Sequence, residues 1–155
     1  MKQWLNLGVI FLSFNLSLNA QSEMEQNLNS FMNAWHQAAA EADADRFFGA
    51  MFEDGIYIGT DATERWLRDE LREWAAFAFE RESAWDFKVR ERNWQIMDGV
   101  YICDELLDTG MGLCRSTAVL RMGPEGIRIK HYQLSLTVPN ELLKAFGELV
   151  NSAEN

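Results

Sequence analysis

The second half of the chain constrains the fold most, because it holds four stretches with the pattern of β-strands and only short turns between them. Residues 85–90 alternate apolar and polar side chains, which is the period of a strand. Further strands are expected over residues 100–107, 113–122 and 127–137, with turn residues at 108–110 and 123–126. Consecutive strands joined by short turns pair antiparallel, so this half predicts an antiparallel sheet.

Helical periodicity dominates the rest of the chain. Ser22 and Glu25 have the spacing of a capping box, and the residues that follow predict one apolar helical stripe: Met24, Leu28, Phe31, Met32, Trp35 and Ala39. Further helices are expected from Asp43, from Asp61 and after Pro139, and residues 56–58 form a short strand. Helices grouped before the sheet cover one of its faces, so the predicted fold class is α+β.

Composition indicates one domain with an acidic surface. The chain has 155 residues, and its 14 basic and 24 acidic residues give a formal net charge of −10. This charge disfavours nucleic acid and anionic membrane surfaces as partners. Without repeats or linkers, residues 21–155 are predicted to form a single domain.

Residues 1–20 have the features of a secretory signal peptide. Lys2 gives a positive start, a mostly apolar stretch runs from Trp4 to Leu18, and Ala20 ends an acceptable cleavage site. An uncleaved anchor is the alternative, but the stretch is short and polar beside the ~20 apolar residues of a membrane span. We expect an exported protein, periplasmic or secreted, with no membrane association after cleavage.

The two cysteines leave their chemistry open. If Cys103 and Cys114 lie opposite each other on neighbouring strands, they form either a disulfide or two buried thiols. Together with the two scattered histidines they show no metal-ligand spacing. Phosphate-binding loops and serine-hydrolase motifs are absent from the sequence, so no metal and no cofactor is predicted.

The element order and several segments resemble the nuclear transport factor 2-like superfamily, and within it the SnoaL-like branch. The resemblance rests on residues 58–66, 104–107, 111–115 and 132–136 running into Pro139-Asn140. It implies a curved antiparallel sheet wrapped against N-terminal helices as a cone, with homodimers common through the outer sheet face. Members include isomerases, cyclases and dehydratases, so function has to be argued from the site.

The sequence lacks residues on which two of these activities depend. Trp35 and His36 stand where ketosteroid isomerases use a tyrosine, and the paired histidines of the dehydratases are missing because His131 is alone in the sheet. Neither activity is transferred to this chain.

Strand parity predicts a polar group inside the cone. A tight turn at Asp108-Thr109 places Cys103 opposite Cys114, with Asp104 diagonal to Arg115 on the same face. His131 and Gln133 fall on that face too, which is the more apolar one and is therefore expected to face the helices. A slip of one residue would reverse a strand.

This group has two interpretations. Asp104 or His131 is a candidate general base, with Arg115 stabilising a developing anion. Alternatively, a buried ion pair and a hydrogen-bonded histidine only stabilise the sheet. Gln133 is a candidate ligand contact.

Aromatic residues supply the other candidate ligand contacts: Tyr57 at the cone mouth, Trp35 and Trp66. Residues of this kind at strand and helix spacing are more often core. Asp61, which has capping-box spacing with Glu64, is expected to be a helix cap, and His36 to be solvated.

Two functions remain open at this level. One is binding of a small hydrophobic or carbonyl-containing molecule, with or without cofactor-independent acid–base chemistry. The other is a non-catalytic dimeric module whose pocket is filled. A cavity of ~300 Å³ reached by Asp104, Arg115 and His131 would favour the first.

Overall fold

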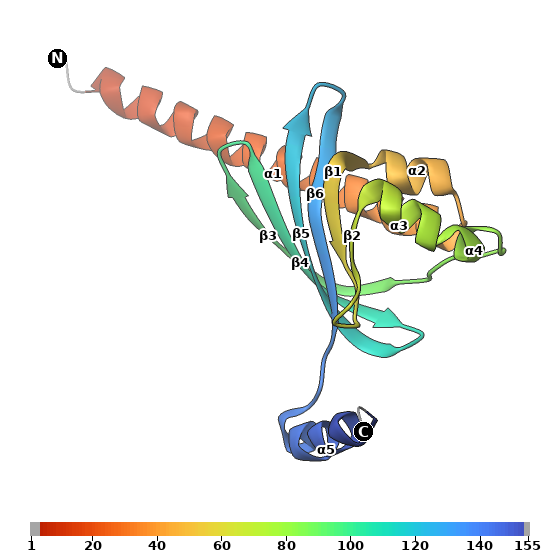
Figure 1. The fold of residues 1–155 in the computed structure, drawn as a ribbon. Coiled ribbons are helices and arrows are strands. Elements are labelled where there is room, and N and C mark those ends of the chain that lie inside the picture. Colours follow the sequence, from red (N-terminus) through yellow and green to blue (C-terminus); the bar gives the residue numbers. More distant parts are fainter. Residues whose placement is uncertain (1–3, 154–155) are drawn as a thin grey trace.

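The structure is a computed structural model that describes the backbone of residues 4–153 and the side chains of residues 21–153. Its elements in chain order are α1 (Trp4–Ala40), α2 (Ala44–Gly49), β1 (Met51–Ile58), β2 (Arg65–Leu67), α3 (Arg68–Trp74), α4 (Ala76–Phe79), β3 (Lys88–Met97), β4 (Val100–Thr109), β5 (Gly112–Gly123), β6 (Gly126–Leu136), η1 (Asn140–Leu142) and α5 (Leu143–Ala153). One curved sheet is covered on one face by the N-terminal helices (Figure 1). This is the predicted α+β class.

Helix α1 packs on the sheet through the stripe that the sequence predicts. Leu28, Met32, Trp35 and Ala39 are buried, and the Trp35 indole donates a hydrogen bond to the carbonyl of Phe47 in α2. Asp43 caps α2 by accepting a hydrogen bond from the backbone of Arg46. These contacts fix the two helices as one layer.

The start of α1 differs from the prediction. The helix does not begin at Ser22 but continues without a break from Trp4. The predicted signal peptide lies partly outside the described residues, at positions 1–3, and over positions 4–20 only the helical backbone is described. In the part of the chain that the structure covers, no helix is long and apolar enough to cross a membrane.

The helix expected from Asp61 begins later, at Arg68. Asp61 instead accepts two hydrogen bonds from Thr63 and so closes a tight turn, and residues 65–67 pair with β1 as the edge strand β2. The helix is capped by Glu70, whose carboxylate accepts a hydrogen bond from the backbone of Leu67. Only the glutamate half of a capping box is therefore present, six residues further along than expected, because the N-cap residue Leu67 has no side-chain acceptor.

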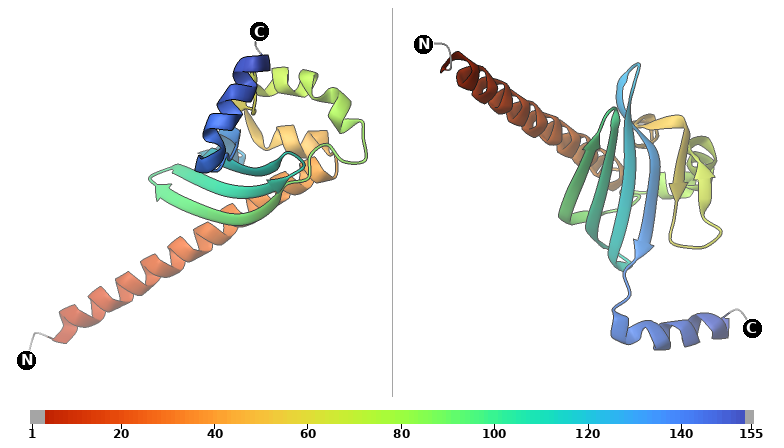
Figure 2. Two further views of the ribbon diagram at one scale, coloured as in Figure 1. Left: turned by 90° about the horizontal axis from the view of Figure 1, so that it is seen from below. Right: turned by 90° about the vertical axis from the view of Figure 1, so that its left-hand side faces the viewer.

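The sheet has the order β2-β1-β6-β5-β4-β3. Four of its pairings are antiparallel, as predicted for the C-terminal strands, while β1 and β6 run parallel. The parallel pair joins the first half of the chain to the last strand, so that β1 and β2 extend the curved sheet (Figure 2).

The predicted register of the β4–β5 hairpin is wrong by four residues. The turn lies at Gly110-Met111, so Cys103 faces Ala118 and Cys114 faces Leu107. Both cysteines are buried and free. Because the shift is an even number, each side chain still points to the face that parity predicts, and only its partner changes.

The expected choice of the inner face is wrong. The inner face carries the residues that strand parity places on the expected outer face: Tyr101, Cys103, Glu105, Leu107, Cys114, Ser116, Ala118, Leu120, Tyr132 and Leu134, all buried. A β-bulge contributed to the error. Val119 pairs with His131 but Leu120 pairs with Ile129, so Lys130 is an extra residue and Ile129 points inward, opposite to His131.

The C-terminal helix α5 follows Pro139, as predicted, but stands apart from the sheet (Figures 1 and 2). It buries none of its residues. Its large apolar side chains are exposed, with Leu149 69% accessible, and some of them line a shallow groove together with the connecting segment 136–139.

Candidate functional site

The polar group predicted inside the cone lies on the outer face of the sheet. Asp104 and Arg115 do form an ion pair, at 3.6 Å, but their side chains are 35% and 54% exposed. Gln133 is exposed as well. His131 is half-buried, and its pKa lies below the ordinary value, first because of burial and second because of the nearby charge of Arg65. None of the four lines the pocket described next.

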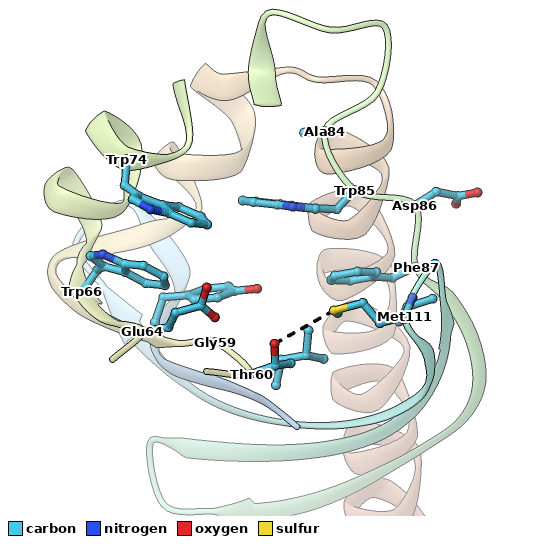
Figure 3. Close-up of a pocket in the computed structure, with 14 residues that line it drawn as sticks. Gly59, Thr60, Glu64, Trp66, Trp74, Ala84, Trp85, Asp86, Phe87 and Met111 are labelled. Carbon is cyan, nitrogen blue, oxygen red and sulfur yellow. Dashed lines mark hydrogen bonds between the residues drawn. The ribbon is translucent and has the colours of Figure 1, made fainter. Parts of the chain in front are cut away.

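The pocket between β1, β2, α3 and the segment before β3 has a volume of about 310 Å³. Its walls are mainly aromatic and are completed by the β4–β5 turn. The lining residues are Tyr57, Gly59, Thr60, Glu64, Trp66, Trp74, Ala84, Trp85, Asp86, Phe87, Thr109, Gly110, Met111 and Leu134. Figure 3 shows Trp66 and Trp74 on one side of the space, with Trp85 and Phe87 facing them from the other.

The aromatic rings contact one another along the walls. Trp66 and Trp74 lie 4.6 Å apart between ring centroids, tilted by 31°. The Tyr57 ring lies 6.4 Å from both Trp66 and Trp85, and is nearly parallel to Trp85. Trp85 is held from behind by Phe47 and Phe79. Because the rings support each other, the walls are preformed, while Trp74 remains 45% exposed at the rim.

Glu64 is the carboxylate inside this aromatic wall. The turn 59–64 positions it: the backbone of Gly59 donates to the carbonyl of Glu64, and the Glu64 carboxylate accepts from the backbone of Asp61 at 3.2 Å. Glycine at position 59 lets the carboxylate lie here, because a Cβ at this position would overlap the end of the Glu64 side chain. Thr60 reaches across the pocket to the sulfur of Met111.

Tyr57 stays protonated in this setting. Burial raises its pKa well above the ordinary value, and the negative charge of Glu64 adds to the shift. Tyr57 and Trp66 were predicted as ligand contacts, and the structure places both in the pocket wall. The predicted Trp35 lies instead in the core, stacked on Phe47 and in contact with Tyr132.

Behind the pocket, a buried polar cluster joins α1 to the sheet. The carboxylate of Glu105 on β4 lies 3.0 Å from Nε2 of His36 and accepts hydrogen bonds from Arg92 at 2.7 Å and Ser116 at 2.9 Å. Arg92 also donates to Asn33 of α1. His36 is only 6% exposed, so the expectation that it is solvated is wrong.

Glu105 is charged in this cluster. Burial alone would raise the pKa of its carboxyl group, but the hydrogen bond from His36 and the positive charges of His36 and Arg92 outweigh it, and the pKa lies below the ordinary value. Tyr132, fully buried beside it, has its pKa raised first by burial and then by Tyr57 and Glu105. The side chains of this cluster contact one another, and none of them lines the pocket.

Sequence reasoning missed Glu64, Trp85 and Phe87 as pocket residues. Glu64 was taken as part of a capping box, and Trp85 and Phe87 as strand residues, whereas β3 starts at Lys88. The signal that was available is the density of aromatic residues around the Gly59 turn and the 84–87 segment. Among the described residues, no group of three or more His, Cys, Asp and Glu side chains could hold a metal ion.

Comparison with known proteins identifies the family. Residues 28–139 match the model of the SnoaL-like domain. No curated protein sequence matches the chain significantly. Among solved structures, an NTF2-like protein of unknown function from Pseudomonas putida KT2440 is 12% identical, with a TM-score of 0.67 over 77% of this chain and 91% of that one.

Two further solved structures share the fold. A candidate ketosteroid isomerase from Parabacteroides distasonis is 18% identical, with a TM-score of 0.58 over 72% of this chain and 86% of that one. A candidate dehydratase of the NTF2-like family from Streptomyces avermitilis is 15% identical, with a TM-score of 0.61 over 77% and 99%. At these identities the likeness concerns the fold. The family match over most of the described chain shows that this protein belongs to the SnoaL-like domain family of the nuclear transport factor 2-like superfamily.

Proposed function

We propose that the chain binds a small, largely apolar molecule in the aromatic pocket. The observation that carries this proposal is the pocket itself, about 310 Å³ in volume and walled by Tyr57, Trp66, Trp74, Trp85 and Phe87. Small-molecule sites in proteins are mostly apolar concavities that begin at about 300 Å³ and hold a few placed polar groups. A module with a filled pocket would not leave this space open between supported rings.

The pocket also offers two groups suited to acid–base chemistry. Tyr57, with its raised pKa, remains a hydrogen-bond donor that could polarise a carbonyl oxygen, and Glu64 could accept a proton. Among the described residues that line the pocket there is no histidine, lysine or arginine. We therefore put binding first and place any isomerase- or dehydratase-like step on Glu64 and Tyr57 rather than on Asp104 and His131.

A ligand screen with a blocked pocket tests the proposal. Isothermal titration calorimetry of residues 21–155 against small aromatic, carbonyl and ammonium compounds should find a binder. Met111→Trp, which fills the pocket from the turn, should weaken that binder by at least about tenfold, or ~1.4 kcal/mol. Met97→Trp is the matched control, because Met97 is also 50% exposed near a hairpin turn but lies outside the pocket.

Two results would contradict the proposal. One is a screen in which nothing binds. The other is a binder that is weakened equally by Met97→Trp and Met111→Trp, since its site would then lie elsewhere.

A further inference from the structure

We propose that the aromatic pocket selects an organic cation, with an ammonium group held against the tryptophan rings and the carboxylate of Glu64. The inference rests on the proposed function and goes beyond it by naming the chemical class of the ligand. Three observations carry it: the charge of the residues that line the pocket, the lack of a cationic partner for Glu64 among the described residues, and the kind of aromatic rings present.

The lining has acidic groups and no basic ones. Glu64 and Asp86 are its charged residues in the described structure. Asp86 points away from the space and lies 3.7 Å from Lys88, both of them exposed, so Glu64 is the carboxylate that faces the cavity (Figure 3). An anionic ligand would be repelled, and the net charge of −10 adds a long-range attraction for cations.

Glu64 has no cationic partner among the described residues. Its carboxylate accepts only the backbone hydrogen bond from Asp61, at 3.2 Å, although the residue is half-buried among aromatic rings. A neutral apolar ligand would remove water from this carboxylate without replacing the lost interactions, which is unfavourable. An ammonium group would replace them with a charge-assisted contact.

The rings are the kind that bind cations best. Trp66, Trp74 and Trp85 are three of the six tryptophans, and tryptophan gives the strongest cation–π attraction. In the described structure, the arginines that lie over aromatic rings are Arg72 on Phe48 and Arg81 on Phe77, which leaves the three tryptophans to a ligand. Aromatic walls are the usual arrangement for binding quaternary ammonium groups, and here Glu64 adds a negative charge to them.

A pair of isosteric probes tests the inference. Choline and 3,3-dimethylbutan-1-ol have the same shape and differ in a charged nitrogen in place of a carbon. Titration of residues 21–155 at low salt, followed by tryptophan fluorescence and calorimetry, should show choline binding at least about tenfold more tightly than the alcohol. Glu64→Gln should remove most of this preference: choline should bind more weakly, and the alcohol should bind as well as before or somewhat more tightly, because a neutral amide costs less to desolvate than a carboxylate.

Glu25→Gln is the control, because it makes the same change in net charge at an exposed position outside the pocket. It should keep the preference for choline. Equal binding of the two probes, or a preference that Glu64→Gln leaves intact, would overturn the inference while the proposed function stands. If neither probe binds but another compound of the screen binds and is weakened by Met111→Trp, the inference fails while the proposed function stands. If no compound binds, both fail.

Discussion

At the scale of single residues, two neighbours on β4 show how the same carboxylate chemistry has opposite consequences on opposite faces of the sheet. Glu105 is buried and contacts His36, Arg92 and Ser116, whereas Asp104 meets Arg115 near solvent. A buried charge that loses its partner remains without compensation, while an exposed ion pair adds little.

Neutralising the two carboxylates should therefore have different effects. Glu105→Gln leaves the Arg92 charge, whose side chain is 8% exposed, without its counter-charge, and should lower the free energy of unfolding by about 3–5 kcal/mol. Asp104→Asn should change it by no more than about 1 kcal/mol. Urea denaturation of both variants measures this. A larger loss for Asp104→Asn would mean that the inner face is the one carrying Asp104.

The same cluster predicts a dependence on pH. Because the pKa of Glu105 is lower in the folded protein than its ordinary 4.5, the unfolded chain takes up the proton first as the pH falls. The stabilisation is complete above the ordinary pKa and is lost as the pH drops through the folded value. The stability difference between the wild type and Glu105→Gln should thus shrink as the pH falls below about 4.5. A difference that grows on acidification would contradict this.

At the scale of elements, the sequence supports the strands and helices but not their exact pairing. The apolar residues from Leu28 to Ala39 follow the helical period and no strand period, and in the structure they form one buried helix face. The β4–β5 turn could not be placed, because Asp108-Thr109 and Gly110-Met111 are both good turn sequences. The bulge at Lys130 has no local signal, yet it decides which way Ile129 points.

These pairing errors explain the incorrect candidate site. Parity correctly groups Asp104, Arg115, His131 and Gln133 on one face, but which face meets the helices depends on long-range packing. The pocket depends on loops: Glu64 reaches it only because β2 starts at Arg65, and Trp85 only because β3 starts at Lys88. Tyr57 was expected on a strand and lies on one, whereas Trp66 was expected on a helix and reaches the pocket from β2.

The turn 59–64 gives a prediction at this scale. In Gly59→Ala, the new methyl group meets the end of the Glu64 side chain, which can move aside. We expect weaker binding of choline, by about three- to tenfold, with little change in the melting temperature. Gly49→Ala is the control, since a Cβ there meets nothing within 4 Å. Unchanged binding by Gly59→Ala would show that the position of the carboxylate is unimportant.

At the scale of the whole molecule, the β1–β6 pair joins the two halves of the domain, and α5 remains outside it. Because α5 buries none of its residues, removing residues 140–155 should leave the melting temperature of the domain within a few degrees of the full chain. Thermal unfolding followed by circular dichroism measures this. A large loss would mean that α5 covers part of the core in solution.

The expected homodimer can be tested on the protein with and without residues 140–155. Apolar side chains on α5, such as Phe146 and Leu149, and half-buried ones on the outer sheet face, such as Ile102, are surfaces that a second copy could cover. Sedimentation equilibrium should give twice the chain mass for residues 21–155. A monomer at micromolar concentration would refute the expectation. Export is a separate prediction, checked by whether the protein recovered from its source begins at Gln21.

The most direct test of the central claim is a crystal structure of residues 21–155 soaked with the tightest compound from the screen. We predict electron density between Trp74 and Trp85, with the polar end of the compound beside Glu64. Density on the outer face, beside Arg115 and His131, together with an empty aromatic pocket, would contradict the account.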